Sequence, residues 1–117
     1  MPKKLDALDY SNLSKEDITW AAGFFEGEGS CGKYFGESYP NGILTAKIAQ
    51  VNEEPLSKLH KLFGGNKYHW VRRKDKRGYF QWQINSAQAF QFMNTILPYL
   101  SAKRQDQFVQ ALKKKRI

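Results

Sequence analysis

The 117-residue sequence predicts a single α+β domain, in which one four-stranded antiparallel sheet carries helices on one face and an extra helix follows at the C-terminus. Two observations support this fold class. Four segments alternate apolar and polar side chains with the period of a strand, and turn residues group them into two hairpins. Each hairpin follows a segment with the apolar spacing and capping residues of a helix. The expected order is therefore αββαββα, followed by one more helix.

The first helix is expected from about residue 15 to residue 26, at the start of a domain covering residues 14–117; residues 1–13 form an N-terminal arm without a clear period. Ser14, with Asp17 three positions later, resembles a capping box. Residues 18–25 are apolar nearly all round, whereas a surface helix has one apolar stripe. Such a helix must be covered on two sides, so we expect a partner subunit. Gly23 and Gly27 share a face and would let two helix backbones approach closely.

The first hairpin is expected from strands at residues 29–39 and 43–51, with the helix broken at residues 27–29. Pro40-Asn41-Gly42 is a strong turn signal between the two strands. Asn52 then caps a second helix, which Gly64 and Gly65 terminate. The hairpin and this helix are the ββ and the second α of the predicted αββαββα order.

The second hairpin is expected from strands at residues 66–73 and 79–85. In the later strand, Phe80, Trp82 and Ile84 should point into the core. Ser86 is expected to cap a third helix, which ends at Pro98, and a last helix begins at about Ala102. The opposite, open face of the sheet should carry polar and basic side chains, namely Lys47, Lys67, His69, Gln81, Gln83 and Asn85.

The basic charge of the chain is concentrated in its second half. The formal net charge is +8 and the sequence pI is about 9.6. Residues 1–65 have a net charge of −2, whereas residues 66–117 have a net charge of +10. A basic excess indicates a polyanionic partner, either nucleic acid or an anionic membrane surface. The membrane is disfavoured, because the sequence has no apolar run of 18 residues and no strong basic amphipathic helix.

The open sheet face allows two interpretations. It is either a solvated face, which antiparallel sheets tolerate, or a platform that binds DNA. Glutamine and asparagine can recognise adenine edges, and lysine can contact guanine or phosphate. A basic cluster at one end of the sheet favours the platform; it consists of Arg72, Arg73, Lys74, Lys76 and Arg77. The only cysteine, Cys31, permits no internal disulfide and no zinc motif, which fits an intracellular compartment, in bacterial or phage cytoplasm or an organelle.

Residues 21–29, Ala-Ala-Gly-Phe-Phe-Glu-Gly-Glu-Gly, resemble the nine-residue signature of the LAGLIDADG homing endonucleases. Two glutamates stand where the signature has aspartates. The αββαββα order resembles the family's core, Gln50 resembles its strand-end glutamine, and Lys103 resembles its active-site lysine. The resemblance therefore covers nearly all of residues 14–112, and it implies a site-specific DNA endonuclease that makes a staggered double-strand break and has no small-molecule substrate.

The resemblance also implies roles for individual residues. Glu28 and the carbonyl oxygen of Gly27 are expected to bind Mg²⁺ or Mn²⁺, since such ions prefer hard oxygen ligands. Gln50 would position a water molecule, or alternatively contact a base. Lys103 would stabilise phosphate charge, or alternatively be a solvated lysine at a helix start. Glu26 is expected to serve packing or hydrogen bonding at the helix end. Glu53 and Glu54 stand where several family members place another active-site base; either Lys61 substitutes for this base or the role is unfilled.

The signature occurs once, so the chain resembles a subunit of the homodimeric members, acting on a long pseudo-palindromic site. The expected dimer interface comprises Ala21, Ala22, Gly23, Phe24 and Gly27. The first hairpin is expected to add Ser30, Lys33, Tyr34 and Ser38 to the DNA contacts. Two alternatives stay open: a non-cleaving nucleic-acid-binding protein on the same fold, such as an intron maturase or a regulator, and an unrelated basic interaction module.

Overall fold

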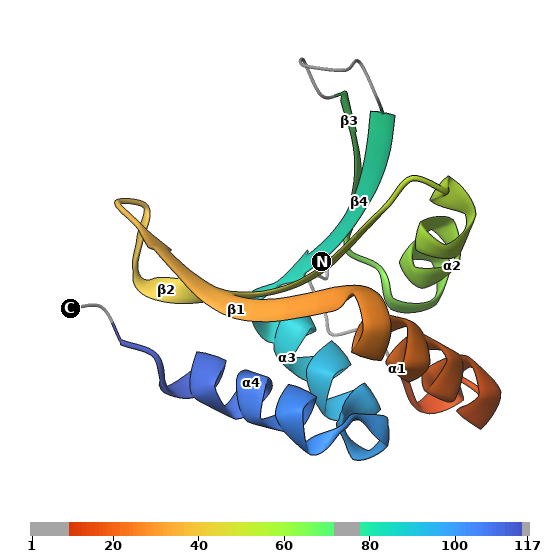
Figure 1. Cartoon of the computed structure of the whole chain (residues 1–117). Coiled ribbons are helices and arrows are strands. Elements are labelled where there is room, and N and C mark those ends of the chain that lie inside the picture. Colours follow the sequence, from red (N-terminus) through yellow and green to blue (C-terminus); the bar gives the residue numbers. More distant parts are fainter. Residues whose placement is uncertain (1–9, 72–77, 116–117) are drawn as a thin grey trace, which may run out of the picture.

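The computed structural model describes residues 10–71 and 78–115 of the chain. Its elements follow the predicted order, with two short 3-10 turns added (Figure 1). The helices and turns are η1 (Tyr10–Asn12), α1 (Lys15–Glu28), α2 (Glu53–Phe63), α3 (Ser86–Ile96), η2 (Leu97–Tyr99) and α4 (Ala102–Lys113). The strands are β1 (Gly29–Gly36), β2 (Tyr39–Gln50), β3 (Asn66–Val71) and β4 (Gly78–Asn85). The predicted α+β class and the predicted sequence of elements are therefore confirmed.

The four strands form one antiparallel sheet in the order β1-β2-β4-β3. Figure 1 shows that the sheet is strongly curved, and that α1, α2, α3 and α4 lie on its convex side. No helix of the described part of the chain covers the concave side. Helices on one face of an antiparallel sheet leave the other face available to solvent or a ligand, as the sequence predicted.

Three predicted boundaries are wrong. Helix α1 does not break at residues 27–29 but continues to Glu28, so its last turn contains Gly27. The first hairpin turns at Glu37 and Ser38 rather than at residues 40–42. Tyr34 pairs with Ile43 and Gly36 with Tyr39, which leaves two extra residues in β2. The expected turn residues therefore form a β-bulge, where Gly42 takes up a φ of +90°.

The third error concerns the start of α3. Asn85, not Ser86, is the N-cap residue, and its side chain makes no capping bond. The Asn85 side chain instead lies on the open face, where Oδ1 accepts hydrogen bonds from Thr45 and Gln83. The chain passes from β4 into α3 without a connecting loop, and Ser86, at this junction, has a φ of +59°.

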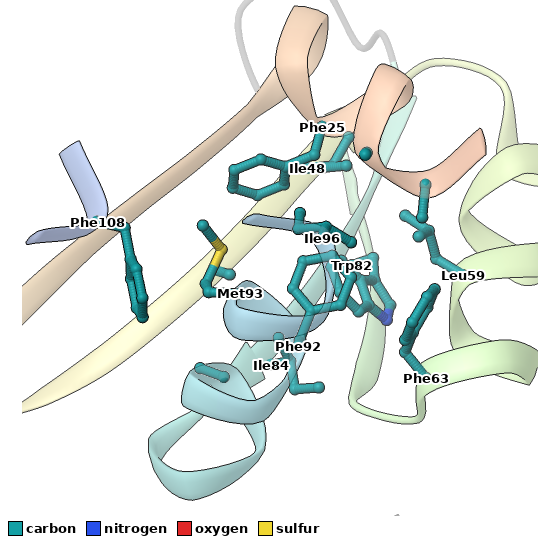
Figure 2. Packing of buried hydrophobic residues seen from close by; sticks show 14 of the residues in the cluster. Phe25, Ile48, Leu59, Phe63, Trp82, Ile84, Phe92, Met93, Ile96 and Phe108 are labelled. Carbon is teal, nitrogen blue, oxygen red and sulfur yellow. The ribbon is translucent and has the colours of Figure 1, made fainter. Parts of the chain in front are cut away.

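The core between the sheet and the helices is centred on Phe92 (Figure 2). Its ring meets the rings of Phe25, Phe63 and Trp82 at centroid distances of 5.8, 4.9 and 5.0 Å, all edge to face. The fully buried Trp82 donates its indole N–H to the carbonyl oxygen of Gly64, 2.8 Å away. These contacts join α1, α2, α3 and β4 in one cluster, as predicted from the inward positions of β4.

The segment before α1 also enters this core. Tyr10 is buried, and its hydroxyl donates a 2.7 Å hydrogen bond to the carbonyl oxygen of Phe63 at the end of α2. Burial raises the pKa of Tyr10 to about 12. The end of the expected N-terminal arm therefore packs against the domain.

The junction between α1 and β1 depends on a close approach at Gly29. Its N–H donates to the carbonyl oxygen of Phe25, and its extended backbone begins β1 directly. A Cβ atom at Gly29 would overlap the ring of Phe25, which is buried and held against Phe92. Glycine is therefore required here by space rather than by backbone conformation.

Replacing Gly29 with alanine is expected to lower the free energy of unfolding by about 1–3 kcal/mol, because the Phe25 ring has no room to move. Urea denaturation followed by tryptophan fluorescence measures this change. Gly36→Ala, in the same strand, is the matched control, since its Cβ would lie 3.4 Å from the nearest atom of Tyr39, an ordinary contact. Equal stability of the two variants would contradict the proposed constraint.

Candidate functional site

Two of the predicted catalytic side chains meet at the end of α1. The Gln50 amide nitrogen donates a 3.1 Å hydrogen bond to Oε1 of Glu28. Glu28 is exposed, and Gln50 is half-buried at the last position of β2. The two residues are 22 positions apart in the sequence. They come together because Gly29 pairs with Ile48, which sets the end of α1 beside the end of β2.

Glu26 serves the helix end, as the sequence interpretation expected. Its carboxylate accepts two 2.8 Å hydrogen bonds from Ser101, one from the backbone N–H and one from the hydroxyl. These two bonds hold the pKa of Glu26 below its usual value, with further help from the charges of Arg104 and Lys103. Because Ser101 is the N-cap residue of α4, Glu26 attaches the start of α4 to the end of α1.

Arg104 is a further residue of this site that the sequence interpretation missed. Its guanidinium donates to the carbonyl oxygens of Glu26 and Gly29, at 3.1 and 2.7 Å. These bonds satisfy backbone acceptors at the α1–β1 junction, where a helix end leaves its carbonyls without helical partners. One signal was present in the sequence: Lys103 and Arg104 stand in the first turn of a helix, where the macrodipole disfavours cations unless they have another task.

Lys103 lies close to the same junction. It is exposed on the first turn of α4, and its charge contributes to the lowered pKa of Glu26. The structure thus places Glu28 in contact with Gln50, and it places Lys103 on the first turn of α4, whose N-cap residue Ser101 bonds to Glu26. The catalytic roles of Glu28, Gln50 and Lys103 stay predictions.

The open face of the sheet carries a connected row of polar side chains. Along β4, Gln81 donates to Gln83 at 2.9 Å, and Gln83 donates to Asn85 at 3.1 Å. Thr45, on the neighbouring strand, donates to Asn85 at 2.9 Å. Such bonds hold the amide groups in fixed orientations, which favours recognition of a defined ligand surface.

Three more of the predicted contact residues, Ser30, Tyr34 and Lys47, lie on this face. Register pairs Ser30 with Lys47 across β1 and β2, and the Lys47 ammonium lies 5.2 Å from the ring centroid of Tyr34. Tyr34, Lys47, Gln83 and Asn85 surround a hollow of about 270 Å³. Ser38 is exposed at the hairpin turn.

Three basic residues that were expected to contact DNA lie on the helix side of the sheet. For Lys67 and His69, which were expected on the open face, the predicted placement is therefore wrong. Lys67 pairs with the buried Trp82, and its ammonium bonds to Glu53 and Ser57 of α2, each at 2.8 Å. His69 stacks on the ring of Phe80 at 4.6 Å. Residues that pair across neighbouring strands point to the same face of the sheet. Because Lys67 and His69 pair with residues that point into the core, the two faces of β3 are exchanged relative to the prediction.

Lys33 is the third of these basic residues. It pairs with the core residue Leu44, and its ammonium donates to the carbonyl oxygens of Leu112 and Lys114, at 3.0 and 3.2 Å. It therefore caps the C-terminal end of α4 rather than facing a ligand on the sheet. Of the other basic residues predicted to contact DNA, Arg72, Arg73, Lys74, Lys76 and Arg77 lie outside the described residues.

The residues that were expected at a dimer interface lie on two different sides of α1. Ala21 and Ala22 are buried in the chain's own core beside Phe25, so their assignment to an interface is wrong. Gly23 and Gly27 are exposed, and Phe24 is partly exposed on the same outer side. An open groove of about 730 Å³ lies between α1 and α2 on this outer side of α1. It is lined by Thr19, Trp20, Gly23, Phe24, Asn52, Glu54, Pro55 and Lys58.

Within residues 10–71 and 78–115, no group of three or more histidine, cysteine, aspartate or glutamate side chains is placed to hold a metal ion. The Glu28 carboxylate is a hard-oxygen donor of the kind that Mg²⁺ prefers. Among the helices in the described part of the chain, none has the length and apolar character needed to cross a membrane.

The bonds of Glu26 predict a pH dependence. The folded-state pKa of Glu26 lies below the ordinary value of 4.5. The ionised carboxylate therefore contributes to the stability of the folded state above about pH 4.5, and this contribution is lost as the pH falls through the folded-state pKa. Titration of the Ser101 amide by NMR should show a midpoint below 4.5, and Glu26→Gln should remove this transition. A midpoint at or above 4.5 would show that the hydrogen bonds to Ser101 do not persist in solution.

No protein-family model matches the sequence, and no curated protein matches it. Solved structures do. The homing endonuclease I-CvuI in complex with its target has a TM-score of 0.63 at 19% identity, covering 85% of this chain and 68% of that one. The archaeal intron-encoded homing endonuclease I-Vdi141I complexed with DNA has a TM-score of 0.60 at 18% identity. The alignment covers 84% of this chain and 65% of that one.

A third similar structure, the LAGLIDADG homing endonuclease I-GzeII in complex with its DNA target, has a TM-score of 0.61 at 19% identity. The alignment covers 97% of this chain and 39% of I-GzeII, so this chain spans well under half of that protein. At these identities the likeness establishes architecture: the chain has the fold of the LAGLIDADG homing endonucleases.

Proposed function

We propose that this protein is a divalent-metal-dependent, site-specific endonuclease that cleaves double-stranded DNA as a homodimer. The observation that carries the proposal is the exposed carboxylate of Glu28, bonded to Gln50 at the end of α1, at the border of an open concave sheet. The similar structures I-CvuI, I-Vdi141I and I-GzeII, described as homing endonucleases in complex with DNA, agree with it.

The open face is suited to duplex DNA. It carries Lys47 and the linked amides of Gln81, Gln83 and Asn85, which are the groups that recognise base edges in a major groove. The formal net charge of the whole chain is +8, which favours association with a polyanion such as DNA. Because the concave face is free of helices, a curved sheet of this kind can follow a groove.

The residues at the end of α1 fit a hard divalent cation. Glu28 and the carbonyl oxygen of Gly27 would hold Mg²⁺ or Mn²⁺, and a second copy of the chain would supply further oxygens. When bound, the metal would activate water and offset charge on the scissile phosphate. Gln50 would orient Glu28 and a water molecule by hydrogen bonding, and Lys103 would stabilise developing charge on the phosphate.

The glycines of α1 support a homodimer. Glycine in a helix interior costs about 1 kcal/mol relative to alanine. A Cβ atom at Gly23 or Gly27 would meet nothing within 4 Å, so the packing of the described residues does not require glycine at either position. Close approach of a second α1 does explain both glycines, and a symmetric pair would bring the two Glu28 carboxylates together near the two-fold axis.

Glu28→Gln is expected to reduce cleavage by at least about 100-fold while leaving DNA affinity nearly unchanged, because glutamine can still accept the bond from Gln50 but lacks the charge that binds the metal. The assay incubates the protein with a randomised duplex library and Mg²⁺, and sequences both the cut and the bound molecules. EDTA should abolish the cuts made by the native protein.

Glu16→Gln is the matched control, since Glu16 is exposed at the opposite end of the same helix. It should cleave like the native protein. Binding without cuts by the native protein, unaffected by Glu28→Gln, would replace the endonuclease with a non-cleaving DNA-binding protein on the same fold.

Gly23→Leu is expected to weaken dimerisation by at least about tenfold, since a large side chain would separate the two α1 helices. Sedimentation velocity over a concentration series measures the dissociation constant. The control is Ala87→Leu, which places the same side chain at an exposed position of α3. A native protein that stays monomeric at all concentrations would refute the shared site.

A further inference from the structure

Two large aromatic side chains stand exposed on the open face of β3. Tyr68 and Trp70 are 38% and 47% exposed, and their ring centroids lie 6.0 Å apart at an angle of 36°. They alternate along β3 with Lys67 and His69, the two residues that the sequence interpretation had placed on this face. In the described part of the chain, these two exposed rings on one face of β3 form an apolar patch that is open to solvent.

The register places this patch beside the polar row of β4. Tyr68 pairs with Gln81, and Trp70 pairs with Tyr79. The open face therefore changes from amides, near Asn85, to aromatic rings, near the last residues of β3 and the first residues of β4. A ligand that lies along the amides and extends past Gln81 reaches the rings, since Tyr68 is the cross-strand neighbour of Gln81.

A duplex offers the rings one distinctive partner. Its base faces are already stacked, so aromatic rings in the major groove can only touch base edges. Among the four bases, thymine alone presents a methyl group there, and apolar side chains recognise thymine through it. Stacking on base faces would require an unpaired strand instead. The linked amides on the same face favour a paired one, because they suit base edges.

We infer that Tyr68 and Trp70 are specificity residues that recognise thymine methyl groups in the DNA bound across the sheet. The inference rests on the proposed function and extends it, since it states which base the aromatic end of the face selects. Gln81 and Gln83 would recognise the neighbouring base pairs by hydrogen bonds. The preferred site should therefore contain thymine at the base pairs that lie over β3.

Uracil in place of thymine tests this inference, because it removes the methyl group and leaves base pairing intact. Duplexes selected by the native protein from a randomised library are amplified once with dTTP and once with dUTP, and the affinity for each pool is measured without divalent metal. We expect the uracil pool to bind about fourfold more weakly for each methyl contact that is lost. Equal affinity for the two pools would overturn the inference.

The variants assign the effect to the rings. Trp70→Ala combined with Tyr68→Ala should bind the thymine pool more weakly and should no longer distinguish the two pools. Phe90→Ala is the matched control, since Phe90 is also 47% exposed but lies on α3, on the other side of the sheet. It should keep the native ratio of affinities. A native ratio in the double variant would assign the methyl contact to other residues and overturn the inference.

Two further outcomes separate the inference from the proposed function. If the native protein binds both duplex pools equally, the function stands and only the thymine contact is refuted. If it binds the heat-denatured thymine pool as tightly as the duplex, the rings stack on unpaired bases and both proposals fall.

Discussion

The direct passage from α1 into β1 is the constraint on which the site depends. With no loop between Glu28 and Gly29, the orientation of the helix fixes the first strand, and the close contact of Gly29 with Phe25 ties both to the core. Arg104 then binds carbonyl oxygens on both sides of the junction, while Glu26 holds Ser101. A helix end stabilised in this way can present Glu28 to solvent without losing its position.

The two faces of the sheet have separate tasks, and the cross-strand register decides which residue serves which. Lys67 and Lys33 are basic, yet both act inside the fold: one binds Glu53 and Ser57, the other binds the final carbonyls of α4. Tyr68 and Trp70 are large and aromatic, yet they face outward. Charge and hydropathy of single residues are therefore poor guides to this surface, because a register shift of one position exchanges the faces.

The same division applies to α1. Its inner side, with Ala21, Ala22 and Phe25, completes the core. Its outer side carries Gly23 and Gly27, and the packing of the described residues does not require glycine at either position. In the proposed homodimer this outer side of α1 packs against a second copy of the same helix, which explains why glycine stands at both positions.

The sequence by itself determined the α+β class, the order of elements, the inward side of β4 and the special character of residues 21–29, because caps, glycines and strand periodicity are local signals. It also identified Glu28 and Gln50, whose contact the structure displays. The tertiary structure alone decided the bulge at residues 40–42, the reversed faces of β3, the inward position of Ala21 and Ala22, and the role of Arg104. Each of these depends on which distant residue is opposite in space, and a linear pattern contains no information about its partner's register.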